Sequence, residues 1–306
     1  MTYTAEPSAR RLRYKIHYSR KNIMKKTTEK AYAKINLYLD VVGKRPDGYH
    51  DILSVMQTVD LFDTVTVRLS DVVNMTCTDE SLSCGEDNLC IKAARAFFDA
   101  LGESGGCNIH LEKHLPMQAG LGGGSSDGAA VLRALNRLYG SPFSRERLCD
   151  IGKRIGADVP FCVAGGTRLA EGIGEILSPY PEMPDCYIVI SGGVGHVSTP
   201  EAYRLIDSTP PSSSGNIEKM TDSLKKGDLT GIASSLYNRF EDTLVECRTV
   251  KNILLSNNAL GALMSGSGSA VFGIFYSEQE ARRAVEALKD SSLTAFLCRP
   301  IGKFDL

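Results

Sequence analysis

Three features are missing from the 306-residue sequence: a Cys-x-x-Cys pair, a long apolar run and a large net charge. The nine cysteines are an odd number without such a pair, which argues against a disulfide framework and a thiolate zinc site and favours a reducing cytoplasm. No stretch reaches about 18 consecutive apolar residues, so we expect no membrane-spanning helix. A formal net charge of -1 argues against a surface built to bind nucleic acid.

The residues that are present describe a globular protein. A hydrophobic fraction of 42% with 23% charged residues is enough to bury a core, and the length predicts two domains. Residues 1–27 read as a basic N-terminal extension, because the first 30 residues carry nine Lys and Arg against two acidic residues, an excess of seven. Met24 would also make an ordinary translation start, and a nucleic-acid or membrane role for the extension is the alternative. The rest of the chain then carries a net charge of -8.

Apolar periodicity predicts mixed helices and strands in two units, residues 28–182 and 183–306. In the first unit we expect strands near 30–41 and 65–69, a turn at 44–48, a helix from Asn88 to Gly102, a short strand at 109–111, and helices ending at Gly140 and Gly156. Strand 30–41 alternates an apolar and a polar face. In the second unit we expect strands at 187–190, 262–264 and 270–276, with helices opened by capping boxes at 198–201 and 277–280.

A glycine run between a predicted strand and a predicted helix is the strongest chemical signal. It comprises Pro116, Met117, Gln118, Ala119, Gly120, Leu121, Gly122, Gly123, Gly124, Ser125 and Ser126. Consecutive amides at a helix N-terminus favour phosphate, although a tight packing turn would use the same residues. The run lacks the lysine of a Walker A loop and the spacing of a dinucleotide-binding loop.

Three polar residues are candidates for phosphoryl-transfer chemistry. Lys34 and Asn36 share the polar face of the first strand, where a lysine can neutralise phosphate charge and an amide can hold a hydroxyl. Asp158, in the turn before Pro160, can orient or deprotonate an attacking hydroxyl. Taken alone, each has a plainer interpretation, since strand lysines are usually solvated and aspartates often cap helices or form turns.

Candidate substrate contacts are Tyr49 and His50, which follow a turn, and His196, which precedes a predicted helix. They are suited to stacking on a base or contacting a sugar, with ordinary loop packing as the alternative. His110 and His114 have the order His-x-x-x-His, but on a strand they lie too far apart to chelate zinc readily.

Three ordered motifs together resemble those of the GHMP small-molecule kinases. They are Ala33 to Leu37, Pro116 to Ser126, and Leu263 to Val271. The likeness spans residues 28 to 300 and implies an α+β fold of two domains: an ATP-binding domain similar to the second domain of ribosomal protein S5 and a ferredoxin-like C-terminal domain, with the active site between them. The segments 45–50, 122–126 and 156–161 narrow it to the branch that uses ATP to phosphorylate a cytidine diphosphate-linked methylerythritol in isoprenoid biosynthesis.

The resemblance also implies roles for individual residues. Lys34 and Asp158 match the catalytic positions, and Pro116 to Ser126 match the loop that wraps ATP. Residues at substrate-side positions are Asn36, Tyr49, His50, Thr199 and Tyr203, with the two tyrosines expected to sandwich cytosine. Mg²⁺ is the expected metal, with Ser126 as a ligand or a direct phosphate contact. The expected partners are small molecules, neither nucleic acid nor membrane, for a monomer or homodimer.

Two positions depart from the family pattern. Asp127 stands where asparagine is common, which puts a carboxylate beside the phosphate loop and bears on Mg²⁺ binding, and Asn238-Arg239-Phe240-Glu241 replaces a usual Asn-Asp-x-Glu. Two other functions stay open: a GHMP kinase for a different small alcohol, and a nucleotide-binding module without catalysis.

Overall fold

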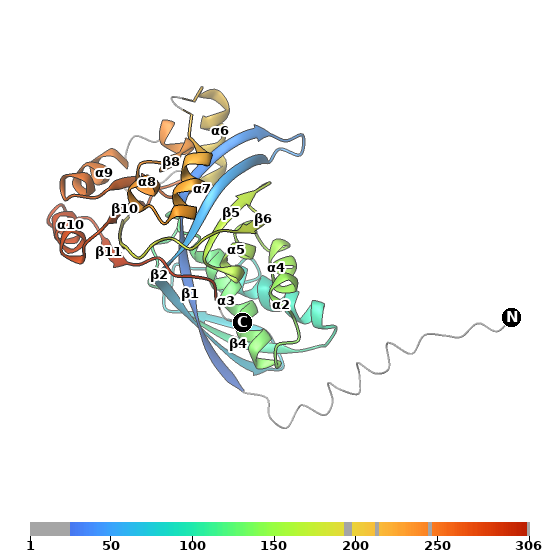
Figure 1. Cartoon of the computed structure of the whole chain (residues 1–306). Coiled ribbons are helices and arrows are strands. Elements are labelled where there is room, and N and C mark those ends of the chain that lie inside the picture. Colours follow the sequence, from blue (N-terminus) through green and yellow to red (C-terminus); the bar gives the residue numbers. More distant parts are fainter. Residues whose placement is uncertain (1–24, 193–197, 212–213, 244–246, 305–306) are drawn as a thin grey trace.

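Two β-sheets and the helices that cover them make up the protein (Figure 1). The computed structural model of the chain describes residues 25–192, 198–211, 214–243 and 247–304. Most of the basic extension and His196 lie outside the described residues. In the part that is described, no helix combines the length and the apolar character needed to cross a lipid bilayer.

The larger sheet has seven strands in the order β3-β4-β2-β1-β8, with β5 pairing with β2 and β6. Its frame is a long antiparallel hairpin that runs from the pair Lys26 and Arg68 to the pair Lys44 and His50. The strands are β1 (Lys26–Lys44), β2 (His50–Ser70), β3 (Asn74–Cys77), β4 (Gly106–Glu112), β5 (Thr167–Glu171), β6 (Ile176–Pro179) and β8 (Tyr237–Asn238).

Four helices accompany this sheet: α2 (Leu89–Leu101), α3 (Gly123–Leu138), α4 (Arg145–Lys153) and α5 (Val159–Ala164). The predicted ends of α2 are confirmed, because Asn88 accepts a hydrogen bond from the Cys90 amide and Gly102 adopts the left-handed conformation at the C-terminus. Helix α3 is buried along most of its length and packs on β1, β2, α2 and α5. The N-terminus of α3 is therefore held rigidly beside the middle of β1.

The alternation of a buried and an exposed face predicted for β1 does not hold in the middle of the strand. Residues 33–39 are buried on both faces, since the glycine run and α3 cover the face that carries Lys34. Lys34 and Asn36 are 5% and 2% exposed. The solvated lysine expected of an ordinary strand is thus not what the fold contains.

The smaller sheet has four antiparallel strands in the order β11-β7-β10-β9. With its helices it follows a β-α-β-β-α-β path, the ferredoxin-like arrangement. The strands are β7 (Tyr187–Ser191), β9 (Gly261–Met264), β10 (Val271–Phe275) and β11 (Ala295–Cys298), and the helices of this half are α6 (Thr199–Ser208), α7 (Ile217–Lys226), α8 (Leu229–Ala233), the short 3₁₀ helix η2 (Arg239–Asp242), α9 (Cys247–Ser256) and α10 (Glu278–Asp290).

The two sheets are joined by more than one linker. Strand β8 pairs in parallel with β1, and Pro300 and Lys303 form bridges to Val59 and Gly165 of the first half. One buried cluster contains side chains of both sheets, among them Ile35 and Phe272. The halves therefore share a core, which fixes the walls of the cavity between them. The boundary near residue 183 stays a prediction.

Candidate active site

A cavity of about 1070 Å³ opens between the two halves of the molecule. Its walls come from β1 and β2, the glycine run, α6, and the loop between β9 and β10. Most of the site residues predicted from the sequence line it: Lys34, Asn36, Tyr49, His50, residues 116–125, Asp158, Thr199 and Tyr203. Residues that are far apart in the chain are thus brought to one place.

The glycine run enters α3 without a capping side chain. Gly122 is the residue before the helix and has a φ of 70°, in the left-handed region that favours glycine. The first amides of α3 therefore have no side-chain acceptor, which is the arrangement that binds anions at a helix N-terminus. Gly120 has a φ of 75°, and a Cβ atom there would lie 2.1 Å from the carbonyl oxygen of Ser265. Only glycine fits this close approach.

The third motif, which contains the loop between β9 and β10, forms hydrogen bonds with the glycine run. Ser265 donates its hydroxyl hydrogen to the carbonyl of Gly120 at 2.9 Å, and the Ala270 amide donates to the Ala119 carbonyl at 2.9 Å. The Asn238 amide donates to the Met264 and Gly266 carbonyls at 2.7 and 2.8 Å. Glu241 accepts from the Met264 amide at 2.7 Å. The Asn and Glu of the unusual 238–241 segment thus brace this loop.

Lys34 and Asp158 face each other beside the glycine run. The Lys34 Nζ lies 3.6 Å from Asp158 Oδ2 and donates to Asn36 Oδ1 at 2.8 Å. Asn36 in turn donates to Ser54 Oγ at 2.8 Å. Asp158 occupies the position before α5, yet its side chain caps no amide of that helix. With 35% of that side chain exposed, the carboxylate is directed to the lysine and the cavity instead of to the helix.

Ser126 departs from its expected position. Its hydroxyl donates to the Tyr32 carbonyl at 2.5 Å, the residue is 1% exposed, and it does not line the cavity. The reason is helical geometry, because Ser126 lies one turn into α3 on the side that packs against β1. The geometry therefore does not fit the metal or phosphate contact expected of Ser126, whereas the neighbouring Ser125 does line the cavity.

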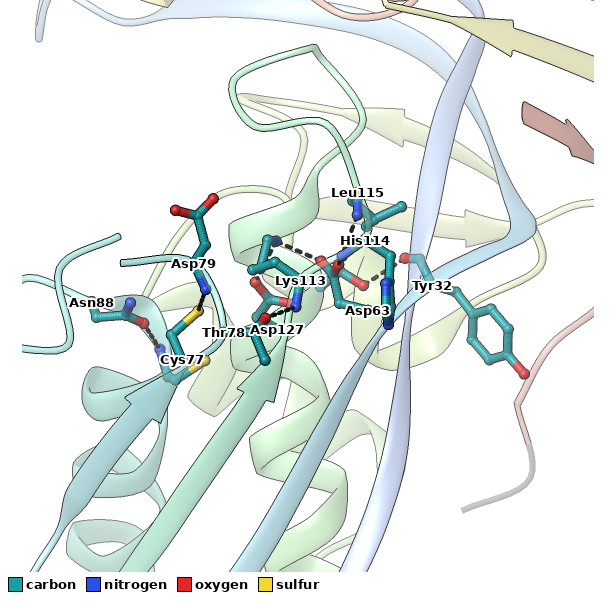
Figure 2. A network of polar contacts seen from close by, with 12 residues as sticks. Tyr32, Asp63, Cys77, Thr78, Asp79, Asn88, Lys113, His114, Leu115 and Asp127 are labelled. Carbon is teal, nitrogen blue, oxygen red and sulfur yellow. Dashed lines mark hydrogen bonds and ion pairs between the residues drawn. The ribbon is translucent and has the colours of Figure 1, made fainter. Parts of the chain in front are cut away.

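A buried ionic triad forms the wall next to the glycine run. Lys113 lies between two carboxylates, 2.5 Å from Asp63 Oδ2 and 3.0 Å from Asp127 Oδ2 (Figure 2). Asp63 also accepts from the amides of His114 and Leu115 at 2.5 and 2.8 Å. Asp127 Oδ1 finds no hydrogen-bond partner among the described residues. Burial raises the pKa of Asp127 to about 7, against the lowering effect of Lys113.

The opposite end of the cavity is aromatic. The rings of His50 and Tyr203 stack with centroids 4.5 Å apart, and Phe240 meets Tyr203 edge-on at 5.0 Å. Tyr49 is 60% exposed and lines the cavity next to His50. Thr199 shares a 3.0 Å hydrogen bond with Ser267 of the third motif. Tyr49 and Tyr203 thus both reach the cavity from different elements.

Sequence reasoning missed several residues of the wall, among them Asn88, Lys113 and Asp207. Asp207 lies four residues after Tyr203 on α6, so helical spacing was a usable signal. Lys113 carried no signal, because its partners are 50 and 14 positions away. No group of three or more metal-binding side chains of His, Cys, Asp or Glu occurs in the described ranges.

The chain matches two protein-family models and several curated relatives. Residues 88–166 match the GHMP kinases N terminal domain, and residues 220–292 match the GHMP kinases C terminal model. A 4-diphosphocytidyl-2-C-methyl-D-erythritol kinase of Caldicellulosiruptor bescii is 43% identical over 266 residues, which are 85% of this chain and 93% of the relative. One of Geobacter metallireducens is 42% identical over 275 residues, 88% of this chain and 96% of the relative.

Solved structures give the same assignment. A crystal structure of 4-(cytidine 5'-diphospho)-2C-methyl-D-erythritol kinase superposes with a TM-score of 0.76 at 33% identity, covering 90% of this chain and 100% of that one. A homoserine kinase from Cytophaga hutchinsonii, at 20% identity and a TM-score of 0.74, covers 92% of this chain and 96% of its own and shares the fold. The expected two-domain GHMP kinase fold is confirmed. The chain belongs to the GHMP kinases and, within them, to the family of 4-diphosphocytidyl-2-C-methyl-D-erythritol kinases.

Proposed function

We propose that this protein transfers the γ-phosphoryl group of ATP to the 2-hydroxyl of 4-diphosphocytidyl-2-C-methyl-D-erythritol, yielding the 2-phosphate and ADP. The observation that carries the proposal is the Lys34–Asp158 pair, which lies between an anion-binding helix N-terminus and an aromatic wall in a single cavity. Phosphoryl transfer depends on positioning and electrostatic stabilisation, and each wall supplies one partner of the reaction.

The ATP phosphates bind the glycine run. The free amides at the start of α3 and the helix dipole both favour negative charge there. The third motif keeps the run in place through the Ser265 and Ala270 hydrogen bonds. Because the charge of the chain outside the basic extension is negative, local amides and Lys34 hold the triphosphate, and bulk attraction contributes little.

Lys34 and Asp158 carry the chemistry. Asp158 accepts the proton of the attacking hydroxyl or orients it, and it is free to do so because it caps no helix amide. Lys34 lies 3.6 Å away and stabilises the charge on the transferring group. Asn36 accepts a hydrogen bond from Lys34 Nζ at 2.8 Å, which fixes the direction of the ammonium group.

Mg²⁺ fits the oxygens of this wall. The ion usually keeps several waters and takes one or two protein oxygens beside the substrate phosphates. Ser125 supplies a hydroxyl on the cavity wall, and Asp127 Oδ1 is a buried oxygen without a partner among the described residues. Both would hold the ion, which when bound neutralises charge on the phosphate oxygens.

The aromatic end binds the cytidine diphosphate part of the substrate. Tyr49 and Tyr203 offer ring faces for stacking on cytosine, an interaction typically worth about 1–3 kcal/mol per base. His50 and Thr199 add polar groups beside them, and Asn36 faces the hydroxyl that reacts. We further propose that the enzyme is cytoplasmic, as a monomer or homodimer, in keeping with its nine free cysteine thiols.

The test is a turnover assay of the full chain with ATP, Mg²⁺ and 4-diphosphocytidyl-2-C-methyl-D-erythritol, with the new phosphomonoester followed by ³¹P NMR. Homoserine and mevalonate serve as control alcohols. A site built from hydrogen bonds and stacking should prefer the cytidine substrate by about 10⁴-fold in kcat/KM. Absence of turnover would refute the proposal, and equal use of a control alcohol would favour a GHMP kinase of other specificity.

Replacement of the aromatic wall separates these two outcomes further. Tyr49→Ala should raise the KM for the cytidine substrate about tenfold, the loss of one stacked base face, while the KM for ATP stays the same. An unchanged KM for the cytidine substrate would mean that cytosine is not recognised here.

A further inference from the structure

Asp207 lies on a helix of the second half of the molecule and contacts both strands of the β1–β2 hairpin. Its Oδ1 lies 2.7 Å from His50 Nε2 and its Oδ2 lies 2.5 Å from Lys44 Nζ. Lys44 ends β1 and His50 begins β2, and the two residues are cross-strand partners in the hairpin. Asp207 itself lies near the end of α6, where Figure 1 shows that helix close to the tip of the hairpin. One carboxylate therefore ties α6 to both strands of the hairpin.

The chemistry of the pair fixes the state of the histidine ring. Hydrogen bonds from Lys44 and His50 hold the pKa of Asp207 below its usual range, so the carboxylate is ionised and only accepts. The Nε2 atom of His50 must then carry the hydrogen of this bond. Asp207 thus sets both the hydrogen position and the rotation of the His50 ring.

The orientation of His50 is transmitted to the aromatic wall. Its ring stacks on Tyr203 at an interplanar angle of 17°, and Tyr203 lies one turn before Asp207 on the same face of α6. The rings of Tyr203 and Phe240 form a T-shaped pair at an interplanar angle of 82°. His50 is 8% exposed, whereas the neighbouring Tyr49 is 60% exposed. The buried ring is therefore held from two directions, by Asp207 and by Tyr203, while Tyr49 stands free.

We propose that Asp207 is a positioning residue for the cytidine substrate: it holds the Nε2 edge of the His50 ring in one orientation, and so aligns the hairpin tip with α6 before the substrate arrives. Preorganisation of this kind lowers the cost of binding without a direct contact to the ligand. The proposal rests on the proposed function, since it concerns the aromatic end of that same site. It assigns no contact between Asp207 and ATP, which binds at the far wall.

A plain surface tether is the competing explanation, and the two differ in what they change. A tether contributes to the free energy of unfolding and affects both substrates alike. Loss of a positioning residue raises the KM of the cytidine substrate alone and has this effect only while His50 is present. Asp207→Ala, Asp207→Asn and His50→Ala, singly and combined, test this as a double-mutant cycle. Asp222→Ala is the matched control, because Asp222 pairs with Lys225 at 3.4 Å on α7, is 59% exposed and lies outside the cavity.

The measurements are KM for each substrate, kcat and Tm in the full chain. Asp207→Ala should raise the KM for the cytidine substrate about tenfold, the low end for a hydrogen bond to a charged group at a partly exposed site. The KM for ATP should stay within about twofold, and Tm should match that of the Asp222→Ala control. Asp207→Asn keeps an acceptor oxygen for Nε2 and should restore most of the affinity. In the His50→Ala background, Asp207→Ala should have no further effect on KM.

Three results would overturn the proposal: an equal rise of KM for both substrates, a fall in Tm that accounts for the loss, or an undiminished effect of Asp207→Ala without His50. The wild-type assay separates this failure from that of the proposed function. If the wild-type protein does not turn over the cytidine substrate, the function itself is wrong. If it does and Asp207→Ala behaves like Asp222→Ala, only the positioning role is wrong.

Discussion

The two ends of the cavity are built by different means. The end that we propose binds phosphate, called the phosphate end below, uses backbone: glycines at positive φ, free helix amides and carbonyls braced by the third motif. Its ionic triad is buried, with Lys113 and Asp127 7% and 3% exposed, whereas Asp158 is 35% exposed. The aromatic end, which we propose binds the cytidine substrate and call the substrate end below, uses side chains from distant elements. Its ionic contacts are open to water, with Lys44 56% and Asp207 30% exposed.

Because of this difference, we expect the two ends to respond differently to substitutions. Buried charges are screened little and are costly to leave unpaired, so the phosphate end should respond strongly to single substitutions. Exposed pairs are typically worth about 0–1 kcal/mol, so the substrate end should respond in smaller steps and depend on salt. Homoserine and mevalonate kinases of known structure share the fold.

Asp158→Asn should have the largest effect, because it removes the group that receives or orients the proton while the shape is kept. We expect kcat to fall by about 10²–10⁴-fold, with the affinity for ATP within about threefold of the wild-type value. Single-turnover kinetics and isothermal titration with a non-hydrolysable ATP analogue measure the two quantities. A kcat equal to that of the wild type would rule out the base assignment and favour a nucleotide-binding module.

Gly120→Ala tests whether the phosphate end depends on backbone geometry. A Cβ at Gly120 would meet the Ser265 carbonyl oxygen at 2.1 Å, and the φ of 75° disfavours any other residue. We expect the KM for ATP to rise at least about tenfold and stability to fall by about 1–3 kcal/mol. Gly43→Ala is the control, since a Cβ there has nothing within 4 Å. Equal behaviour of the two variants would mean that the run bends freely.

The helices, the strands and the position of the glycine run before a helix could be predicted from the sequence, because their signals are local. Asn88 and Gly102 bracket one helix, and the glycine run lies between a strand and a helix, so each is specified by a few neighbouring residues. The burial of Lys34 was not predictable from alternation, because the element that covers it lies almost ninety residues away. The roles of Lys34 and Asp158 came from the family likeness, and they stay predictions.

The sequence did not allow us to predict which side chains of the site contact one another. Ser125 and Ser126 are adjacent and chemically identical, and only the rotation of α3 sends one to the cavity and the other to the Tyr32 carbonyl. Asp127 pairs with Lys113 in a triad whose members are up to 64 positions apart. Local patterns carry no information about such pairings, since these depend on the packing of whole elements.

Asp127→Asn tests how burial of the Asp127 carboxyl affects the pH dependence of stability. Burial raises the pKa of Asp127 to about 7, above its value of about 3.9 in an unfolded chain, so the folded protein holds the proton more tightly. The stability from this protonation is complete below about pH 4 and is lost as the pH rises through 7. The variant does not titrate, so its Tm should gain on the wild type by about 2 °C or more between pH 5 and 8.

Loss of the Lys113 partner should lower the Tm of Asp127→Asn at every pH, so the slope of the difference is the result that matters. Asp79→Asn is the control. Hydrogen bonds from Ser81 lower the pKa of Asp79, which therefore titrates below this range and should give a flat difference. Parallel curves for Asp127→Asn and the wild type would contradict the raised pKa of Asp127.

Lys44→Met should have the smallest effect, because it changes an exposed ion pair at the substrate end. It removes the outer contact of Asp207 but leaves the hydrogen bond from His50. Because the lysine is 56% exposed, the KM for the cytidine substrate should rise only about two- to threefold at low salt. At about 1 M salt, where the screening length is about 3 Å, the variant and the wild type should converge. A tenfold rise that persists in salt would contradict the distinction between the two ends, because it would give the exposed pair the weight of a buried one.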